Sequence, residues 1–163
     1  MIESSTIETA MYQVGQLFLL PVLALVALLF LYALYALGGF AVQAWQRRDP
    51  QAPAGYPLRR YVQQRPTATE DELDLVAHRL LEKERLASRI APMLGLVGTM
   101  IPMGPALRAL ADGNLARVSD SLTVAFSAVI LALIAASITY WVSNIRRRWL
   151  AEELVALQRK GAA

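Results

Sequence analysis

The sequence has no cysteine, and its one histidine among 163 residues is His78. Without cysteine the chain can form neither a disulfide nor a thiolate metal site. It also lacks a glycine-rich phosphate loop, a Ser/His/Asp grouping and paired carboxylates within its apolar segments. These absences argue against an enzyme, and we expect neither a metal site nor a cofactor.

Charged side chains are missing from two long segments, 17–42 and 121–145, whose only ionisable groups are tyrosine phenols. Each segment exceeds the roughly 20 residues that a helix needs to cross about 30 Å of hydrocarbon. A secretory signal is the alternative for the first segment, but residues 1–16 contain no Lys or Arg and the apolar run is too long. With 56% hydrophobic residues, the chain is expected to be an integral membrane protein.

A third apolar segment, 90–111, is interrupted by residues of low helix propensity. It contains Pro92, Pro102, Pro105, Gly95, Gly98 and Gly104, and Thr99 is its one hydroxyl. Small residues let neighbouring helices approach closely, and proline is tolerated in a span when a neighbour or water satisfies the freed carbonyl. We expect this helix to border a hydrated pathway, with Thr99 facing protein or water.

Basic residues are distributed unevenly around these spans. Segments 43–89 and 146–163 hold fourteen Lys and Arg, residues 1–16 hold none, and the region around the turn after the second span holds Arg108 and Arg117. The positive-inside rule places the N-terminus outside and the C-terminus in the cytoplasm. The pI near 9.5 could suggest nucleic acid, but the basic residues flank spans, so orientation and contact with anionic lipid explain them better.

The segment between the first two spans divides into two halves. Residues 49–66 contain four prolines and Gly55 and predict an irregular connector. A capping-box pattern at 69–72 then predicts an amphipathic helix over about 70–90 that runs into the second span. Its apolar stripe contains Leu73, Val76 and Leu80, and a second stripe after the third span contains Trp149, Leu150, Leu154 and Leu157. Helix contacts between subunits are the simplest way to cover both stripes.

The predicted organisation is therefore all-α. It comprises a periplasmic segment 1–16, transmembrane helices 17–42, 90–111 and 120–145, a cytoplasmic linker and helix 43–89, a periplasmic turn 112–119 and a cytoplasmic helical tail 146–163.

The run from Ala91 to Met100, APMLGLVGTM, resembles the APxxGLxGTV signature that opens the second span of ExbB, TolQ and MotA-type proton-channel subunits. The resemblance covers Arg89–Gly104 well and 119–150 loosely, and the first span agrees as an apolar run. It implies a homopentamer in a bacterial or archaeal cytoplasmic membrane, whose second and third spans line a pore. The pore would hold an ExbD-, TolR- or MotB-like single-span partner that carries a proton-binding aspartate.

The same resemblance implies roles for particular residues. Thr99 would be the pore hydroxyl of the second span. The residues that set close packing and the local helix bend would be Pro92, Gly95, Gly98 and Gly104.

The third span departs from the family pattern, which has a second pore threonine three residues before a glycine. In one register these positions are Ala125 and Ala128, and in another they are Val129 and Ala132, so neither offers a hydroxyl. Thr123 and Ser127 are the nearest substitutes and share a helix face, but both could instead bond the carbonyl four residues earlier. Asp120 matches an acid of ExbB-like members in the first register, and it is also a candidate N-cap of the third helix.

The leading hypothesis is a pore-forming subunit of a motor driven by the proton-motive force. The short cytoplasmic segment argues against torque on a flagellar rotor and favours ExbB- or TolQ-like work delivered into the periplasm. A non-conducting scaffold for a partner helix is the second hypothesis, and an accessory subunit of an unrelated transporter is the third.

Overall fold

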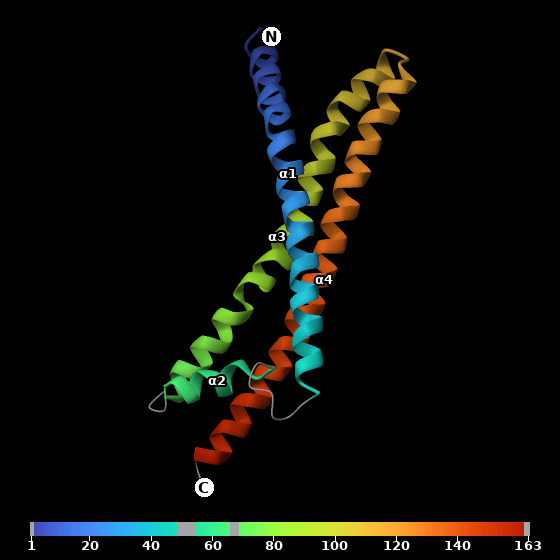
Figure 1. Cartoon of the computed structure of the whole chain (residues 1–163). Helices are drawn as coiled ribbons and strands as arrows, with labels where there is room; N and C mark the ends of the chain where they lie inside the picture. The colour runs from blue at the N-terminus through green and yellow to red at the C-terminus, as the bar shows by residue number, and fades with distance from the viewer. Residues whose placement is uncertain (1, 49–54, 66–68, 162–163) are drawn as a thin grey trace. The chain divides into compact units, whose positions relative to one another are not determined.

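The computed structural model describes residues 2–48, 55–65 and 69–161. Regular structure in this part of the chain consists of four helices, which are α1 (Ile2–Gln46), α2 (Pro57–Gln64), α3 (Glu70–Ala111) and α4 (Leu115–Gly161) (Figure 1). Helices α1, α3 and α4 each contain a stretch that is long and apolar enough to cross a membrane. For the described residues this confirms the predicted all-α class, with three helices that are able to span a membrane.

Helices α3 and α4 continue well beyond their apolar stretches. The amphipathic helix expected over 70–90 is the first half of α3, and the expected helical tail is the last part of α4. The Thr69 hydroxyl accepts a bond from the Glu72 amide at 3.4 Å, so Thr69 serves as the predicted N-cap of α3. The cytoplasmic location of these parts stays a prediction.

The turn between α3 and α4 is shorter than predicted. It consists of Asp112 to Asn114, whereas the prediction was 112–119. Gly113 has a φ of 71°, a left-handed conformation that glycine adopts without strain. The Asn114 amide bonds the Ala109 carbonyl at 2.8 Å and the Gly113 amide bonds the Leu110 carbonyl at 3.1 Å, which together form a Schellman motif. The left-handed Gly113 and the Schellman motif therefore end α3, and only three residues separate it from α4.

The prediction that Asp120 caps the third helix is wrong. Helix α4 begins at Leu115, and the Asn114 side chain caps it by accepting a bond from the Arg117 amide at 3.1 Å. Asp120 lies more than a turn inside α4 and is exposed. The cap formed at Asn114 because the Schellman turn brings the chain directly into the next helix.

The irregular connector predicted for 49–66 is wrong over Pro57–Gln64, which form α2. Proline is tolerated at the first position of a helix, where its missing amide would have no intrahelical partner. The Leu58 amide of the same turn donates to the Glu153 carboxylate of α4 at 3.0 Å, and the Leu58 side chain is fully buried. Contacts with a residue far along the chain thus stabilise this helix, and local sequence could not reveal them.

The helices contribute to two compact units. Unit 1 consists of Met1–Tyr32 and Arg89–Ala136, and unit 2 of Ala33–Ser88 and Ser137–Ala163. The core of unit 2 joins α2, α3 and α4 through Leu58, Ala77, Leu81 and Leu150, with Val76, Leu154 and Leu157 packed against them.

The two apolar stripes therefore pack against each other, with α2 added, within one chain. Contacts between subunits at these stripes stay a prediction. Leu81 is buried, whereas Leu80 of the predicted stripe is 44% exposed.

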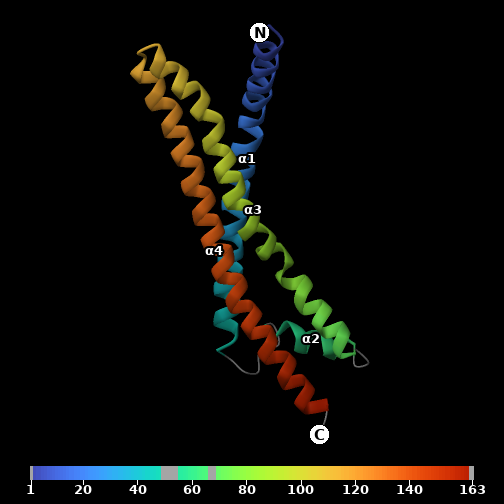
Figure 2. The same cartoon turned by 180° about the vertical axis from the view of Figure 1, so that it is seen from behind.

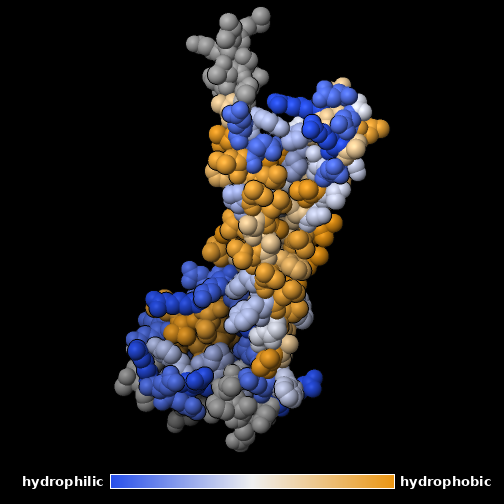
Figure 3. Space-filling model, turned by 45° about the horizontal axis from the view of Figure 1, so that its top comes forward, coloured by the Kyte–Doolittle hydropathy of each residue, from blue (hydrophilic) through white to orange (hydrophobic). Residues whose placement is uncertain are grey.

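In unit 1 the segments of α3 and α4 lie side by side on either side of their short turn (Figure 2). Large apolar side chains such as Leu17, Leu20 and Met100 are exposed, as expected for helices whose solvent is lipid. On the face shown in Figure 3, hydrophobic side chains cover the long middle stretch of the helices and hydrophilic ones gather beyond it.

Candidate pore-lining site

The contact between α3 and α4 in unit 1 is made by residues with little or no side chain. A Cβ added at Gly95 would lie 2.7 Å from the Ala132 Cβ, and one added at Gly98 would lie 3.2 Å from the Ala128 Cβ. The same Gly98 position is 3.7 Å from Val22 of α1, so three helices meet there. The two glycines predicted to set close packing thus allow an approach that Gly95, in particular, could not keep if it were alanine.

Other small residues are buried at helical spacing along both helices. The α3 side contains buried Ala91, Gly95, Gly98, Pro102, Ala106 and Ala109, and the α4 side contains buried Ala125, Ala128, Ala132 and Ala135. We call these residues the small-residue seam. Both family registers for the missing threonine involve seam residues, and neither supplies a hydroxyl.

The three prolines lie inside α3, where each lacks the amide that would bond the carbonyl four residues earlier. Pro105 frees the Ile101 carbonyl, and the Gln16 side-chain amide of α1 donates to this oxygen at 3.4 Å. A polar side chain of α1 thus compensates for a proline of α3, in line with the rule that a neighbour can satisfy a carbonyl freed by proline.

Near the α3–α4 turn, an aromatic residue of α1 packs on α3. The Tyr12 ring is 3.4 Å from the Cβ position of Gly104, and the Arg108 guanidinium lies 4.0 Å from the ring centroid. Gly104 therefore makes room for a ring, whereas Gly95 and Gly98 make room for a helix. The cation–π contact gives Arg108, which is exposed, a partner at this end of α3.

Thr99 follows Gly98 directly and is half-buried at the edge of the seam. Its hydroxyl donates to the Leu96 carbonyl at 2.7 Å. This bond uses the hydroxyl proton and leaves the oxygen lone pairs available to accept from water or another donor.

Thr123 and Ser127 are placed apart from Thr99. Their hydroxyls donate to the carbonyls of Ser119 and Thr123, both at 2.8 Å, which is the back-bonding that the sequence left open. At about 100° per residue, Thr123 lies roughly 160° around α4 from Ala125, and Ser127 lies roughly 100° from Ala128. Both hydroxyl residues are exposed, whereas these alanines are buried. The structure therefore does not gather the predicted hydroxyls on one face of the α3–α4 pair.

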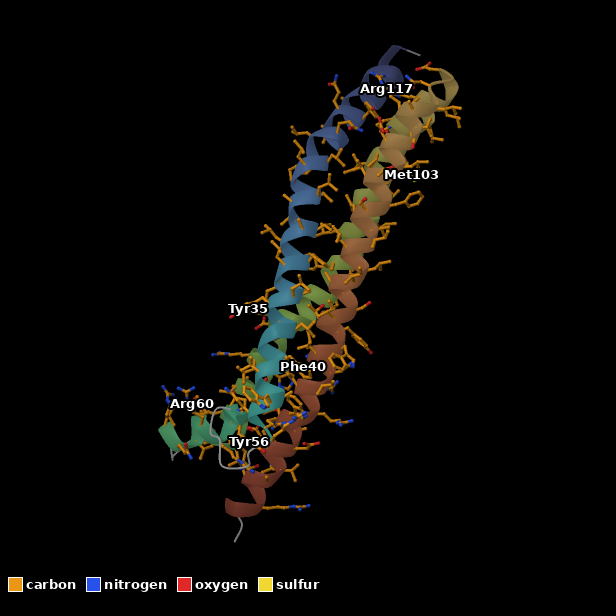
Figure 4. The ribbon with its side chains drawn as sticks, turned by 45° about the vertical axis from the view of Figure 1, so that its right-hand side comes forward. Tyr35, Phe40, Tyr56, Arg60, Met103 and Arg117 are labelled. Carbon is orange, nitrogen blue, oxygen red and sulfur yellow. The ribbon has the colours of Figure 1, made fainter. Side chains whose placement is uncertain are left out.

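A second polar cluster, which sequence reasoning missed, lies in unit 2. The Arg47 guanidinium pairs with the buried Glu153 carboxylate at 2.5 Å and lies 4.7 Å from the Tyr56 ring and 4.6 Å from the Trp149 ring. Phe40 stacks against Trp149, with ring centroids 5.2 Å apart. Figure 4 labels Phe40 and Tyr56, two of the aromatic residues of this cluster. One signal was available, since Glu153 falls on the same helix face as Leu150, Leu154 and Leu157.

Burial raises the pKa of the Glu153 carboxyl above its ordinary value of 4.5. The Leu58 amide bond and the Arg47 charge lower the pKa, but less than removal from water raises it. A second pair in the same unit joins Arg146 of α4 to Glu84 of α3 at 2.5 Å. Both acids of these pairs lie among apolar residues, so each needs its arginine.

Among the described residues, no group of three or more His, Asp or Glu side chains is placed to hold a metal ion. His78 is 65% exposed by its side chain and contacts Asp74 of the same helix.

These observations define a class: helical membrane proteins of several spans, with a glycine–alanine seam and a second span that is broken by prolines and carries one hydroxyl, the half-buried Thr99. Residues 58–159 match the model of the MotA/TolQ/ExbB proton channel family, and the chain belongs to this family. The match includes α2, α3 and nearly all of α4, and it confirms the resemblance seen at 91–100. Neither the curated proteins nor the solved structures contain a significant match to the chain.

Proposed function

We propose that this protein is the pore-forming subunit of a motor complex driven by the proton-motive force. Five copies would surround the single transmembrane helix or helices of an ExbD-, TolR- or MotB-like partner that carries an aspartate within the membrane. Family membership supports the channel class, and the half-buried Thr99 beside the seam is the observation that carries the assignment to a hydrated path.

The physical role of Thr99 in this proposal is to hold water. A proton cannot cross dry hydrocarbon, so polar groups must keep water beside the partner's acid. The Thr99 oxygen retains acceptor capacity after bonding Leu96, and no charged side chain is needed from this chain. Protonation of the aspartate changes its charge and its preferred position in the ring, driven by about 2.3 kcal/mol per charge per 100 mV.

The proposed setting is a bacterial or archaeal cytoplasmic membrane, with the N-terminus outside and the C-terminus in the cytoplasm. The excess of basic residues in 43–89 and 146–163 supports this orientation. Work would be delivered through the partner into the periplasm, as in ExbB- or TolQ-like systems. Proton and not sodium is the ion we propose, on the basis of the family.

Thr99→Val tests this proposal, because valine keeps the shape and removes the oxygen. We expect partner-dependent proton flux into liposomes containing the full complex to fall at least about tenfold, which corresponds to roughly 1.4 kcal/mol. Expression and assembly should be unchanged.

Thr123→Val is the matched control, since it removes a hydroxyl of the same kind from the face of α4 that is turned away from the seam. Its flux should stay near the wild-type value. Unchanged flux in Thr99→Val would remove Thr99 from the mechanism, and loss in Thr123→Val alone would move the water path to the other face of α4, toward Ser127 and Asp120.

A second candidate function is a non-conducting scaffold that gathers the partner helix. The hydroxyl-free seam of Ala125, Ala128 and Ala132 favours it, because the second pore threonine of the family has no equivalent there. Flux through the wild-type complex separates the two functions: a scaffold would give no proton flux that depends on the aspartate of the partner.

A further inference from the structure

A cavity of about 360 Å³ lies in unit 2 beside the Arg47–Glu153 pair. Its lining residues are Arg47, Tyr56, Arg59, Trp149, Glu152 and Glu153. This volume is at the lower end of the range for ligand pockets, so it suits a small polar group and not a whole lipid or a peptide.

The predicted span boundaries place the cavity at the depth of lipid headgroups. Arg47 is five residues beyond the charge-free segment that ends at Val42, and Trp149 is four beyond the one that ends at Ile145. At 1.5 Å per residue these positions are roughly 6–8 Å outside the hydrocarbon, and the headgroup layer extends about that far. A tryptophan at this depth is typical of the membrane interface.

Among the described residues that line the cavity, two are basic and two are acidic. Arg47 and Glu153 neutralise each other across 2.5 Å, and Leu58 occupies the second oxygen of the glutamate. The remaining charges are Arg59, whose guanidinium lies 4.4 Å from the Tyr56 ring centroid, and the exposed Glu152. Neither forms an ion pair with another of the described residues.

We propose that this cavity binds the phosphoethanolamine headgroup of a membrane phospholipid. The Arg59 guanidinium binds the phosphate through charge-assisted hydrogen bonds, and the Glu152 carboxylate binds the ammonium group. A wholly anionic headgroup fits less well, because Glu152 repels it and no group of such a ligand satisfies Glu152. A choline headgroup lacks the N–H donors that a carboxylate would accept.

The arrangement of aromatic rings holds the site in place before a lipid arrives. Arg47 lies over both Tyr56 and Trp149, and it donates from Nε to the Gly55 carbonyl at 3.0 Å. These contacts connect the end of α1 to α2 and α4, so a bound headgroup would contact a preformed site. Pre-organisation of this kind lowers the entropic cost of binding.

Native mass spectrometry of the purified full-length protein tests the proposal. The probes are phosphatidylethanolamine, phosphatidylglycerol and phosphatidylcholine with identical acyl chains. We expect the wild type to retain phosphatidylethanolamine about tenfold more than either other lipid. Arg59→Gln should lower retention of phosphatidylethanolamine and phosphatidylglycerol alike, whereas Glu152→Gln should lower that of phosphatidylethanolamine alone and abolish the preference.

Arg60→Gln is the control for Arg59→Gln, and Glu82→Gln is the control for Glu152→Gln. Each control makes the same substitution at an exposed position that does not line the cavity. Circular dichroism confirms that all four variants fold. The proposal would be overturned if the wild type retained the three lipids equally. It would also be overturned if Arg59→Gln and Glu152→Gln retained lipid as their control variants do. If phosphatidylglycerol were preferred, and Glu152→Gln left that preference unchanged, the cavity would be a general site for anionic lipids and the proposal would be wrong. The measurement does not involve proton flux, so its outcome is separate from that of the proposed channel function.

Discussion

Glu153 shows how one side chain can connect several parts of this fold. Its two carboxylate oxygens accept from Arg47 and from the Leu58 amide, and it is 2% exposed. The second contact places a negative charge at the N-terminus of α2, where the helix dipole favours it. A buried carboxylate with these partners fixes where α2 lies, although removal from water makes its charged form costly.

The stability of unit 2 should therefore depend on pH through Glu153. The pKa of Glu153 in the native state is raised above 4.5, so between these two pKa values the native state binds more protons than the unfolded state. The free energy of unfolding should therefore fall as the pH rises toward the native pKa, and it should level off above that pKa. Glu153→Gln removes this titration.

Thermal unfolding of the wild type and Glu153→Gln between about pH 4 and 8 measures the effect. The Tm of the wild type relative to that of Glu153→Gln should decrease with rising pH. A difference that stays constant or increases would show that burial does not dominate the environment of this carboxyl.

At the scale of the element, α3 combines the features of a packed helix and a broken one. Gly95 and Gly98 allow α4 to approach closely, whereas Pro105 leaves the Ile101 carbonyl without its intrahelical donor. Gln16 of α1 supplies a donor from another helix. The proline is thus tolerated because of a specific neighbour, and the two residues should be energetically coupled.

Gln16→Leu should lower the free energy of unfolding by about 0.5–1.5 kcal/mol, because the Ile101 carbonyl loses its donor. In a Pro105→Ala background the same change should cost nearly nothing, since the alanine amide can bond Ile101 within α3. Unfolding in bicelles or mild detergent measures this double-mutant cycle.

Gln13→Leu is the control for the cycle, since Gln13 is an exposed glutamine one turn earlier in α1. Its effect should be small and the same in both backgrounds. Equal effects of Gln16→Leu with and without Pro105 would show that the Gln16 bond does not compensate for the proline.

At the scale of the whole molecule, the family match extends over 58–159 of the 163 residues. The proposed pentamer would bring five Thr99 hydroxyls around one axis. Exposed apolar side chains such as Phe126 and Ile130 give each copy surface for lipid or for its neighbours.

The mass of the purified particle in a small detergent or nanodisc should correspond to five times 17.9 kDa, apart from its partner and lipid. Closed rings of this kind have one subunit number because the interface angle fixes it. Native mass spectrometry or mass photometry counts the copies. A monomer, or a ring with another number of subunits, would contradict the proposed assembly.

Much of this architecture was predictable from local patterns. Charge-free segments identified the first and third spans, APMLGLVGTM indicated the family, and Thr69 with Glu72 marked the start of α3. These predictions succeeded because hydrophobic length, capping and proline–glycine content act on residues that are close together in the chain. The direction of insertion and the pore role of Thr99 stay predictions of the same analysis.

Contacts between distant residues were decided only by the tertiary structure. Glu153, 95 residues away, accepts a bond from the Leu58 amide at the start of α2, whereas the proline-rich local sequence indicated a loop. Asn114 caps α4 in place of Asp120, and Thr123 and Ser127 turn away from the seam that contains Gly95. The sequence by itself determined which segments leave water, because transfer to lipid depends on composition along a helix. Which faces of those helices meet depends on side-chain fit across space, and no local pattern contains that information.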